Sequence, residues 1–445
     1  MENKSPKALF VMPATDGPSE VATPAPPQAA PRLRRANRDQ VLLRPCSLEE
    51  LLEPEHPART VWALVTSWDL SRFLEVIRAR GEAPGRSAID PVILISLWLY
   101  AYTQNVSGGR ELERLCDSHD AYRWICGGVP VNYHTLNDFR TDHEEALDDL
   151  LTQMVAALTS QDLVKVERIS NDGTRVRAAA GRSSFKTLET INEHLAEARA
   201  HVEAMKTQAR DPKASQQRQQ ARERAARDRQ ERLEKAVKEV QKVANAKAEQ
   251  KEKASKHQPA KASTTDPEAR QMRVPGGGTA PALNVQFAVA IEGRAIVGVD
   301  VTNAGSDVHQ SEPMRKQVEQ RTGQKVTQMQ LDGGYIGLEN IDAAASAGTT
   351  IYAPVPKPKK KGTDRHQPKR GDSEAVAEWR VRMGTDAAKA QYKERASTVE
   401  TANGECKMYR GLRQFLVRGI PKARCVALWS ALAYNFVHFG RQLMT

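Results

Sequence analysis

The hydrophobic pattern of this chain changes its period, and that change is the strongest constraint on the fold. Between residues 46 and 162 apolar residues recur every three to four positions, which predicts an all-α domain. From Val164 to Ala180 the period becomes two, in VKVERISNDGTRVRAAA, which predicts a strand pair or hairpin around Asp172. The chain must therefore combine a helical domain with a sheet.

Further strands are indicated later in the chain. The stretch NVQFAVAIEGRAIVGVDVTNAG contains two strand-like runs with a turn at Glu292 and Gly293, and KVTQMQLDGGY and TTIYAPVP follow, each preceded by a helix-like segment. Strand, strand, strand, helix, strand, helix, strand is the order of a ribonuclease H-like mixed sheet. We therefore predict an α+β chain, with an α/β domain made of residues 163–185 and 263–445.

A helical insert, residues 186–262, interrupts this predicted domain. Apolar or small residues alternate three and four positions apart, which is typical of a two-helix seam. They are Leu188, Ile191, Leu195, Ala198, Val202 and Met205, then, after the break at Asp211 and Pro212, Leu233, Val237, Val240 and Ala244. An antiparallel helical hairpin is the simplest interpretation. Residues 210–261 contain 16 Lys or Arg against 8 Asp or Glu, so the hairpin either has a solvated charged face or contacts a DNA backbone.

The composition indicates what kind of partner and which cellular compartment suit the chain. The 445 residues carry a net charge of +11, which favours a polyanionic partner, and the five scattered cysteines fit a reducing compartment. No secretory signal is evident, and the most apolar run, residues 91–102, is too short to cross a bilayer. We expect a cytoplasmic, nucleoid-associated protein without membrane contact. Residues 1–45, rich in Pro and Ala, are predicted to be a disordered arm.

The helical domain, residues 46–162, is predicted to bind DNA. Within it RELERLC, a Cys-Gly-Gly break and VNYHTLNDFR suggest a helix, a turn and a second helix. In one interpretation Tyr133, His134, Asn137 and Arg140 of the second helix enter a major groove. In the other they are ordinary surface and core positions of a helical bundle.

Three acidic residues are the main candidates for chemistry. Asp172 and Asp332 lie in or at the end of strand-like runs, and Glu400 lies in a helix-like run near the C-terminus. Carboxylate oxygens are the ligands that Mg²⁺ prefers, and a two-metal site for phosphoryl transfer needs several of them. Each Asp is followed by Gly, which leaves room for a ligand, although a single Asp-Gly is more often only a turn.

Several stretches together give a specific resemblance. They are GRSAIDPVILISLWLYAY, RELERLC, NYHTLNDFR, DGTRVRAAAGRSSF, DPEARQM, NVQFAVA, VTNAGSD, LDGGY and YKERASTVETANGECK. The chain resembles DDE transposases of bacterial insertion sequences, in the branch with an N-terminal helical domain and a ribonuclease H-like catalytic domain. The resemblance covers residues 51–441 and implies that Asp172, Asp332 and Glu400 bind two Mg²⁺ ions, for which Mn²⁺ can substitute.

The resemblance also implies roles for residues around the third acid. The family's Tyr, Arg, Glu, Lys signature corresponds to Tyr392, Arg395, Glu400 and Lys407, of which Tyr392, Arg395 and Lys407 would contact DNA. Glu400 and Lys407 are seven residues apart, about two helical turns, so both are expected to face the site. Arg395 precedes Glu400 by five positions where four are expected, which predicts that Arg395 is displaced around the helix.

Some assignments stay open at this level. Glu394 and Glu405 compete with Glu400 for the position of third acid, although neither keeps the seven-residue relation to Lys407. Tyr335, just after LDGG, either stacks on a displaced base near the cut or covers the core at the end of a strand. Asp266 in TDPEAR recurs in the family pattern, and a capping role explains it equally well.

The resemblance implies an enzyme that cleaves DNA at the ends of an insertion sequence and transfers the strands to a target. Its partners would be double-stranded DNA, at the terminal inverted repeats and the target site, and a second copy of the chain in a homodimer. A transposase-derived DNA-binding protein without cleavage activity is the alternative. A nuclease that cuts but does not join is a third reading, against which the helical domain and the basic insert argue.

Overall fold

The computed structural model describes residues 45–81, 87–207, 216–249, 259–274, 276–358 and 362–444. The predicted disordered arm lies outside the described residues except for its last residue. Residues 47–445 form one compact unit, and the description below concerns that unit. Within the described ranges, no helix is long and apolar enough to cross a membrane.

The N-terminal part is helical, as predicted. Its elements are η1 (Glu49–Leu51), α1 (Pro57–Ser67), α2 (Ser71–Glu75), α3 (Pro91–Thr103), α4 (Gly109–Ser118), α5 (Asp120–Cys126), α6 (Tyr133–Thr141) and α7 (Glu144–Ser160). Asp90 caps α3 by accepting a hydrogen bond from the backbone N–H of Val92, and Pro91 occupies the first turn. Helix α3 is buried on nearly every side, because it packs against both α1 and the C-terminal helix α15 (Ile420–Phe439).

The second helix of the proposed groove-reading pair is α6, and part of that interpretation is wrong. Arg140 is buried, donates to the backbone oxygen of Ser107 and lies over the ring of Trp98 at 4.9 Å. A guanidinium held in this way cannot reach a DNA base. At Arg140 the bundle-core interpretation is the correct one.

The sheet has six strands: β1 (Lys165–Arg177), β4 (Arg270–Arg273), β5 (Thr279–Glu292), β6 (Ile296–Thr302), β7 (Gln328–Leu331) and β8 (Thr350–Tyr352). Their order is β4-β5-β1-β7-β8, and β6 also pairs with β5. Strand β5 runs antiparallel to its neighbours, whereas β1, β7 and β8 are parallel. The mixed α/β class is confirmed, and the ribonuclease H-like assignment stays a prediction.

Helices α10 (Ser311–Thr322) and α11 (Leu338–Ser346) connect β6 to β7 and β7 to β8, in the order expected from the sequence. The predicted turn at Glu292 and Gly293 joins β5 to β6. The predicted hairpin around Asp172 is wrong, because β1 is one strand of 13 residues with Asp172 and Gly173 paired to Phe287 and Gln286 of β5.

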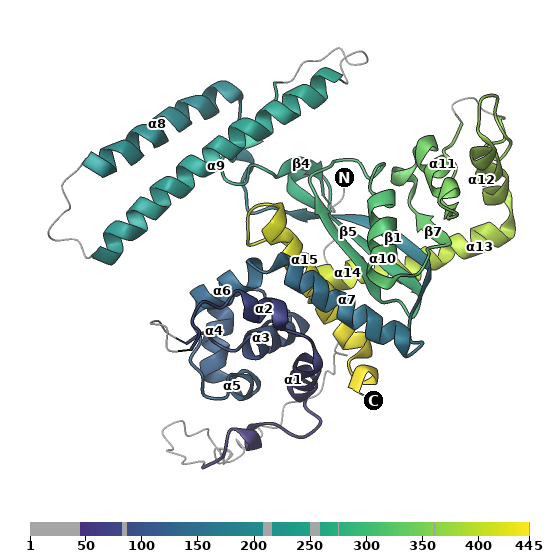
Figure 1. Cartoon of the computed structure of the whole chain (residues 1–445). Coiled ribbons are helices and arrows are strands. Elements are labelled where there is room, and N and C mark those ends of the chain that lie inside the picture. Colours follow the sequence, from purple (N-terminus) through teal and green to yellow (C-terminus); the bar gives the residue numbers. More distant parts are fainter. Residues whose placement is uncertain are drawn as a thin grey trace, which may run out of the picture. The chain divides into compact units, whose positions relative to one another are not determined.

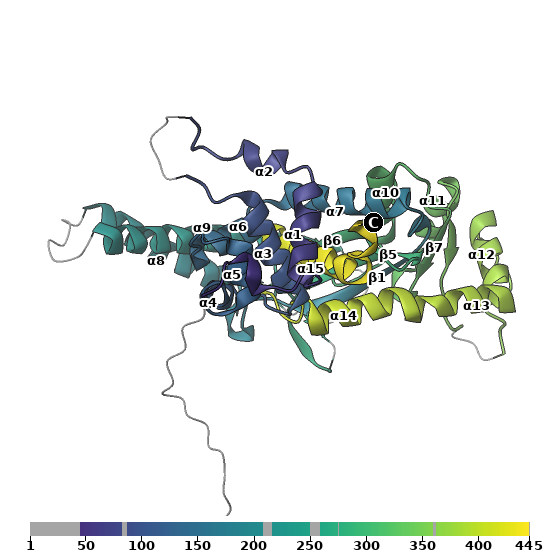
Figure 2. The ribbon, with the colours of Figure 1, turned by 90° about the horizontal axis from the view of Figure 1, so that it is seen from below.

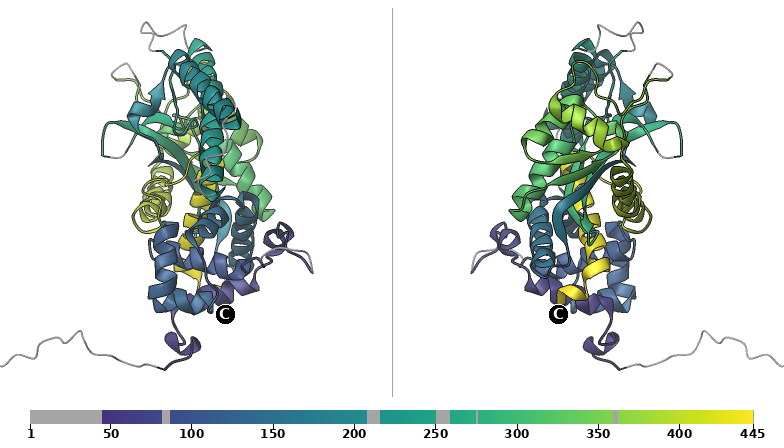
Figure 3. Two further views of the ribbon diagram at one scale, coloured as in Figure 1. Left: turned by 90° about the vertical axis from the view of Figure 1, so that its left-hand side faces the viewer. Right: turned by 90° about the vertical axis from the view of Figure 1, so that its right-hand side faces the viewer.

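The insert forms helices α8 (Leu188–Thr207) and α9 (Gln216–Glu249), which lie side by side (Figures 1 and 3). Their contact is largely the predicted seam, with Ile191, Leu195, Ala198, Leu233 and Val240 in one apolar cluster. Ala236, which was not predicted there, joins the cluster, the predicted Val237 is partly buried against it, and the predicted Ala244 is exposed. Leu188, also predicted there, is 38% exposed at the start of α8. The predicted break at Asp211 and Pro212 lies outside the described residues. Two short strands, β2 (Phe185–Lys186) and β3 (Ala262–Ser263), pair where the insert leaves and rejoins the sheet.

The C-terminal part carries α12 (Glu374–Gly384), α13 (Asp386–Arg395), a π-helical turn η5 (Ala396–Glu400), α14 (Thr401–Tyr409) and α15. Helix α13, the π turn and α14 form one continuous helix that lies along the sheet (Figure 2). Helix α15 packs against α3, α7 and β6, so one hydrophobic core extends from the N-terminal helices into the sheet. The domain boundary drawn at residue 162 stays a prediction.

Candidate active site

Asp172 lies in the middle strand of the sheet, and the register places Asp332 beside it. In the parallel pair of β1 and β7, Asn171 is opposite Leu331, so Asp172 and Asp332 are the next residues on adjacent strands. Neighbouring strands are about 4.8 Å apart. Two acids separated by 160 positions are therefore brought together by strand pairing alone. Asp332 directly follows β7 and accepts a hydrogen bond from the backbone N–H of Gly334.

The carboxylate of Asp172 is mostly buried and has two partners from the C-terminal helices. Arg395 Nη2 lies 2.6 Å from Asp172 Oδ1, and Asn403 Nδ2 donates to Asp172 Oδ2 at 2.9 Å. Burial raises the pKa of Asp172 to about 6, the charge of Arg395 opposes that rise, and the charges of Asp332 and Glu400 add to it. All three predicted acids thus act on one another electrostatically.

Arg395 joins the third acid to the first. Its Nη1 donates to Glu400 Oε1 while its Nη2 contacts Asp172, so both carboxylates lie within reach of a single guanidinium. The predicted displacement of Arg395 is wrong, and the reason is the π turn between the two residues. A π-helix bonds residue i to i+5, so residues five apart share a face there as residues four apart do in an α-helix.

The two competing acids have other partners. Glu394 accepts hydrogen bonds from Arg168 and from Gln330. Glu405 lies 2.7 Å from Arg410 and 2.9 Å from His438. Glu400, whose side chain is 52% exposed, is the glutamate that faces Asp172.

The other two signature residues also lie near the acids, Tyr392 near all three and Lys407 near Asp172. Burial raises the pKa of Tyr392. The charge of Arg395 opposes this rise, and the charges of Asp332, Glu400 and Asp172 add to it. Burial lowers the pKa of Lys407, which the charge of Asp172 opposes. No ion pair joins Lys407 to any acid in the described part of the chain, so its ammonium is available to a ligand.

Behind the acids lies a polar network that the sequence did not reveal. The buried Asp307 accepts hydrogen bonds from Asn284 at 2.6 Å and Gln286 at 2.9 Å, and contacts Arg175 at 2.7 Å. Tyr335 donates its hydroxyl to Gln286 and is 1% exposed. Of the two interpretations of Tyr335, the core residue is correct, because a ring buried in this way cannot stack on a base.

Gly173 is required by this network. An added Cβ would overlap Gln286 Nε2, Asp307 Oδ1 and Asn284 Oδ1. The missing side chain therefore makes room for protein groups beside the acids, rather than forming the turn that an Asp-Gly pair usually indicates. Asp307 belongs to VTNAGSD, one of the stretches that carry the resemblance, and this was the one signal that could have identified it.

The carboxylate oxygens of the three acids are suitable ligands for a hard divalent cation. Asp172 and Asp332 are adjacent on the sheet, and Glu400 reaches them from the π turn, which gives three carboxylates of the type that Mg²⁺ prefers. Among the described residues no group of three His, Cys, Asp or Glu side chains is arranged to hold an ion directly. Instead, Arg395 bridges Asp172 and Glu400, and its positive charge compensates the acids.

Two family models match the chain. Residues 46–142 match the transposase domain (DUF772), and residues 357–439 match the transposase DDE domain. The second match contains Tyr392, Arg395, Glu400 and Lys407, whereas Asp172 and Asp332 fall outside both. No curated protein and no solved structure matches the chain.

Proposed function

Since the chain is a DDE transposase of insertion sequences, we propose that it cleaves DNA at the ends of its element and joins the freed 3′ ends to target DNA. The observation that carries this proposal is the meeting of Asp172, Asp332 and Glu400 around Arg395. Separate elements deliver these side chains to one place, as a phosphoryl-transfer site requires.

In this proposal the three acids hold two Mg²⁺ ions, or Mn²⁺ in their place. Asp172 and Asp332 would hold one ion, and Asp172 and Glu400 the other. Such ions, when bound, polarise the phosphate and make water or a 3′-hydroxyl more acidic. Asn403 fixes the orientation of Asp172 through its hydrogen bond to Oδ2. The donor chemistry of the site supports this assignment.

The basic residues of the site are proposed to bind the DNA end. Lys407 offers a half-buried ammonium that no acid of the described residues neutralises. Arg395 is 7% exposed and its two Nη atoms contact Asp172 and Glu400, so it would bind a phosphate only where bound ions take over these carboxylates. Tyr392, half-buried near Arg395, would pack against the terminal nucleotide. Together these groups hold the scissile phosphate in place and offset the charge that develops on it.

We further propose that the protein acts as a homodimer in the cytoplasm, at the nucleoid. An insertion sequence has two inverted ends, and cutting both in one complex requires two active sites. The terminal inverted repeats and the target DNA are the proposed partners.

The test is an excision assay. Purified protein, Mg²⁺ and a plasmid carrying the inverted repeats that flank the coding region should give excised element with the wild type. Asp172→Ala, Asp332→Ala and Glu400→Ala should each abolish excision, whereas Glu394→Gln, which changes a neighbouring acid with other partners, should keep it. Binding without cleavage by all of these proteins would point instead to a transposase-derived DNA-binding protein.

A further inference from the structure

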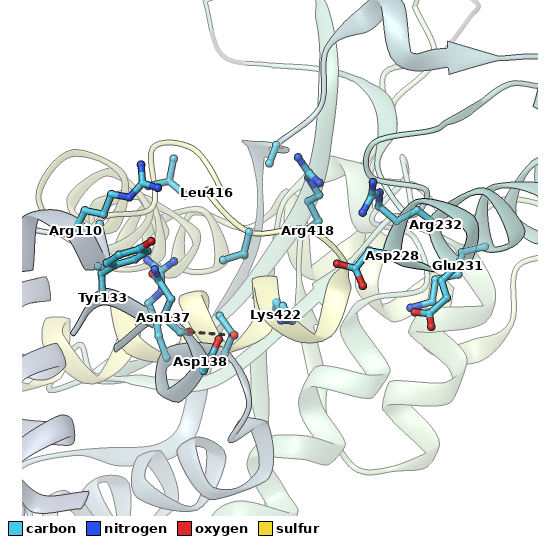
Figure 4. Close-up of a pocket in the computed structure, with 17 residues that line it drawn as sticks. Arg110, Tyr133, Asn137, Asp138, Asp228, Glu231, Arg232, Leu416, Arg418 and Lys422 are labelled. Carbon is cyan, nitrogen blue, oxygen red and sulfur yellow. Dashed lines mark hydrogen bonds between the residues drawn. The ribbon is translucent and has the colours of Figure 1, made fainter. Parts of the chain in front are cut away.

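A groove outside the acidic site is built from three distant parts of the chain. It has a volume of about 760 Å³ and is lined by α4 and α6, by the insert helix α9, and by the segment that leads into α15 (Figure 4). The helical domain, the insert and the segment before α15 are far apart in sequence. The groove therefore exists only in the folded chain, and neither the helical domain nor the insert forms it alone.

Cations dominate its walls. Arg110, Arg232, Lys235 and Arg418 line the groove, and no salt bridge within the described ranges joins them to an acid. Lys422 also lines it and lies 3.7 Å from Asp142. Three acids share the lining, namely Asp138, Asp228 and Glu231, so positive charge remains in excess.

Two of these cations are held close together. Burial lowers the pKa of Arg232, the nearby charge of Arg418 lowers it further, and the charge of Asp228 opposes the shift in part. Like charges repel, so their closeness costs free energy that an anionic ligand between them would offset. A surface evolved only for solubility would space these groups apart.

The segment that carries Arg418 is fixed at both ends. The backbone N–H of Phe415 donates to the oxygen of Arg177 at the end of β1. On the other side Asp266 Oδ1 accepts from the N–H of Gly419 at 3.2 Å, and Glu268 Oε2 accepts from the N–H of Ile420 at 3.1 Å. The loop therefore presents Arg418 in a defined position, as a preformed binding site requires.

The groove lies near the end of β1, the strand that carries Asp172. Ala179 lines the groove, and Asp172 is seven residues earlier. At about 3.3 Å per residue the separation is at most about 23 Å. For a duplex lying along β1 this corresponds to about six base pairs, and to no more than about seven, at about 3.4 Å each.

We propose that this groove binds the sugar–phosphate backbone of the element-end duplex about six base pairs from the cut. The inference rests on the proposed function, since it takes the acids as the point of cleavage. It gives the insert a specific role: α9 forms one wall of a clamp on the end DNA, and the helical domain forms the opposite wall.

The test compares two double variants of equal charge change. Arg232→Glu with Arg418→Glu alters the groove, whereas Arg222→Glu with Arg224→Glu alters exposed positions of α9 that do not line it. Binding to a fluorescent duplex carrying the inverted repeat is followed by anisotropy in EDTA, so that no cleavage is involved. We expect the groove variant to lose about tenfold or more in affinity, and the slope of log K against log salt to fall by about 1.8. The control variant should stay near the wild type.

Hydroxyl-radical footprinting locates the contact. The wild type should protect the backbone about six base pairs from the end, and the groove variant should lose that protection while retaining the rest. Equal affinities and footprints for the two double variants would overturn the inference and leave the proposed function standing. If the wild type fails to bind the duplex, both fail. Should the groove variant unfold, Arg232→Gln with Arg418→Gln gives the same comparison with half the charge change.

Discussion

Arg395 is the residue whose removal tests the geometry of the site most directly. The Arg395→Ala variant loses one guanidinium that serves two carboxylates. Arg395 and Asp172 have side chains only 7% and 19% exposed, whereas Glu400 is 52% exposed. Removing one member of a buried pair leaves an uncompensated charge and costs about 3 kcal/mol or more. The exposed contact with Glu400 adds little. We therefore expect a loss of about 3 kcal/mol in the free energy of unfolding at pH 8.

The loss should depend on pH, and its sign follows from the pKa of Asp172. That pKa is about 6 in the folded chain, above its ordinary value of 3.8, so burying the ionised carboxylate lowers stability as the pH rises through this range. Without Arg395 the folded pKa rises further, because the charge that favoured ionisation is gone. At pH 5 Asp172 is then protonated and needs no partner. Arg395→Ala should consequently destabilise the protein less at pH 5 than at pH 8.

Urea unfolding at both pH values provides the measurement. Asp172→Asn and the double variant Asp172→Asn with Arg395→Ala complete a double-mutant cycle. The double variant should lose much less free energy of unfolding than the sum of the losses of the two single variants. Arg72→Ala is the matched control, since Arg72 also contacts two acids, Glu145 and Asp149, but is 54% exposed. It should cost less than about 1 kcal/mol. Additive losses in the cycle, or an equal loss at pH 5 and pH 8, would refute the reasoning.

Three further predictions test neighbouring features. Gly173→Ala should lower the free energy of unfolding by about 1–3 kcal/mol, because the added methyl overlaps Gln286. Gly404→Ala, in a helix with open space around it, should raise the free energy of unfolding by up to about 1 kcal/mol. Thermal unfolding compares the two variants. Burial raises the pKa of Asp266 from 3.8 to about 6, so the free energy of unfolding of the wild type should fall by about 2.4 kcal/mol between pH 4 and pH 8. Asp266→Asn should not show this fall in urea unfolding at each pH. Deleting Ser397 should turn the π turn into a plain α-helix and change unfolding by no more than about 1 kcal/mol, and a larger loss would mean that the inserted residue is itself needed.

Much of the fold follows from patterns that are local in the sequence. The period of two identifies β1, two strand-like runs around a turn identify β5 and β6, and the three-and-four spacing identifies the seam between α8 and α9. Asp90 before Pro91 correctly marks the start of α3. These features are predictable because the residues that produce them are neighbours along the chain and need no knowledge of what packs against them.

The errors arise where a distant part of the chain decides the outcome. Asp172 and Gly173 suggest a turn, yet side chains from β5 occupy the space that Gly173 leaves, and the strand continues. Arginine is a residue type that commonly contacts DNA, yet Trp98 and the backbone of Ser107 hold Arg140 in the core. No pattern around these residues reports their partners, which come from elsewhere in the chain.

The π turn explains how the site tolerates an irregular spacing. In a plain α-helix a step of five residues would rotate Arg395 well away from Glu400, since successive residues are about 100° apart. The widened turn absorbs the additional residue between them, so α13 before it and α14 after it both keep their faces toward the sheet. Tyr392 and Arg395 on one side, and Glu400, Asn403 and Lys407 on the other, can then surround the same carboxylate. The feature that made the sequence look irregular is thus the one that keeps the site together, as π turns at functional sites often do.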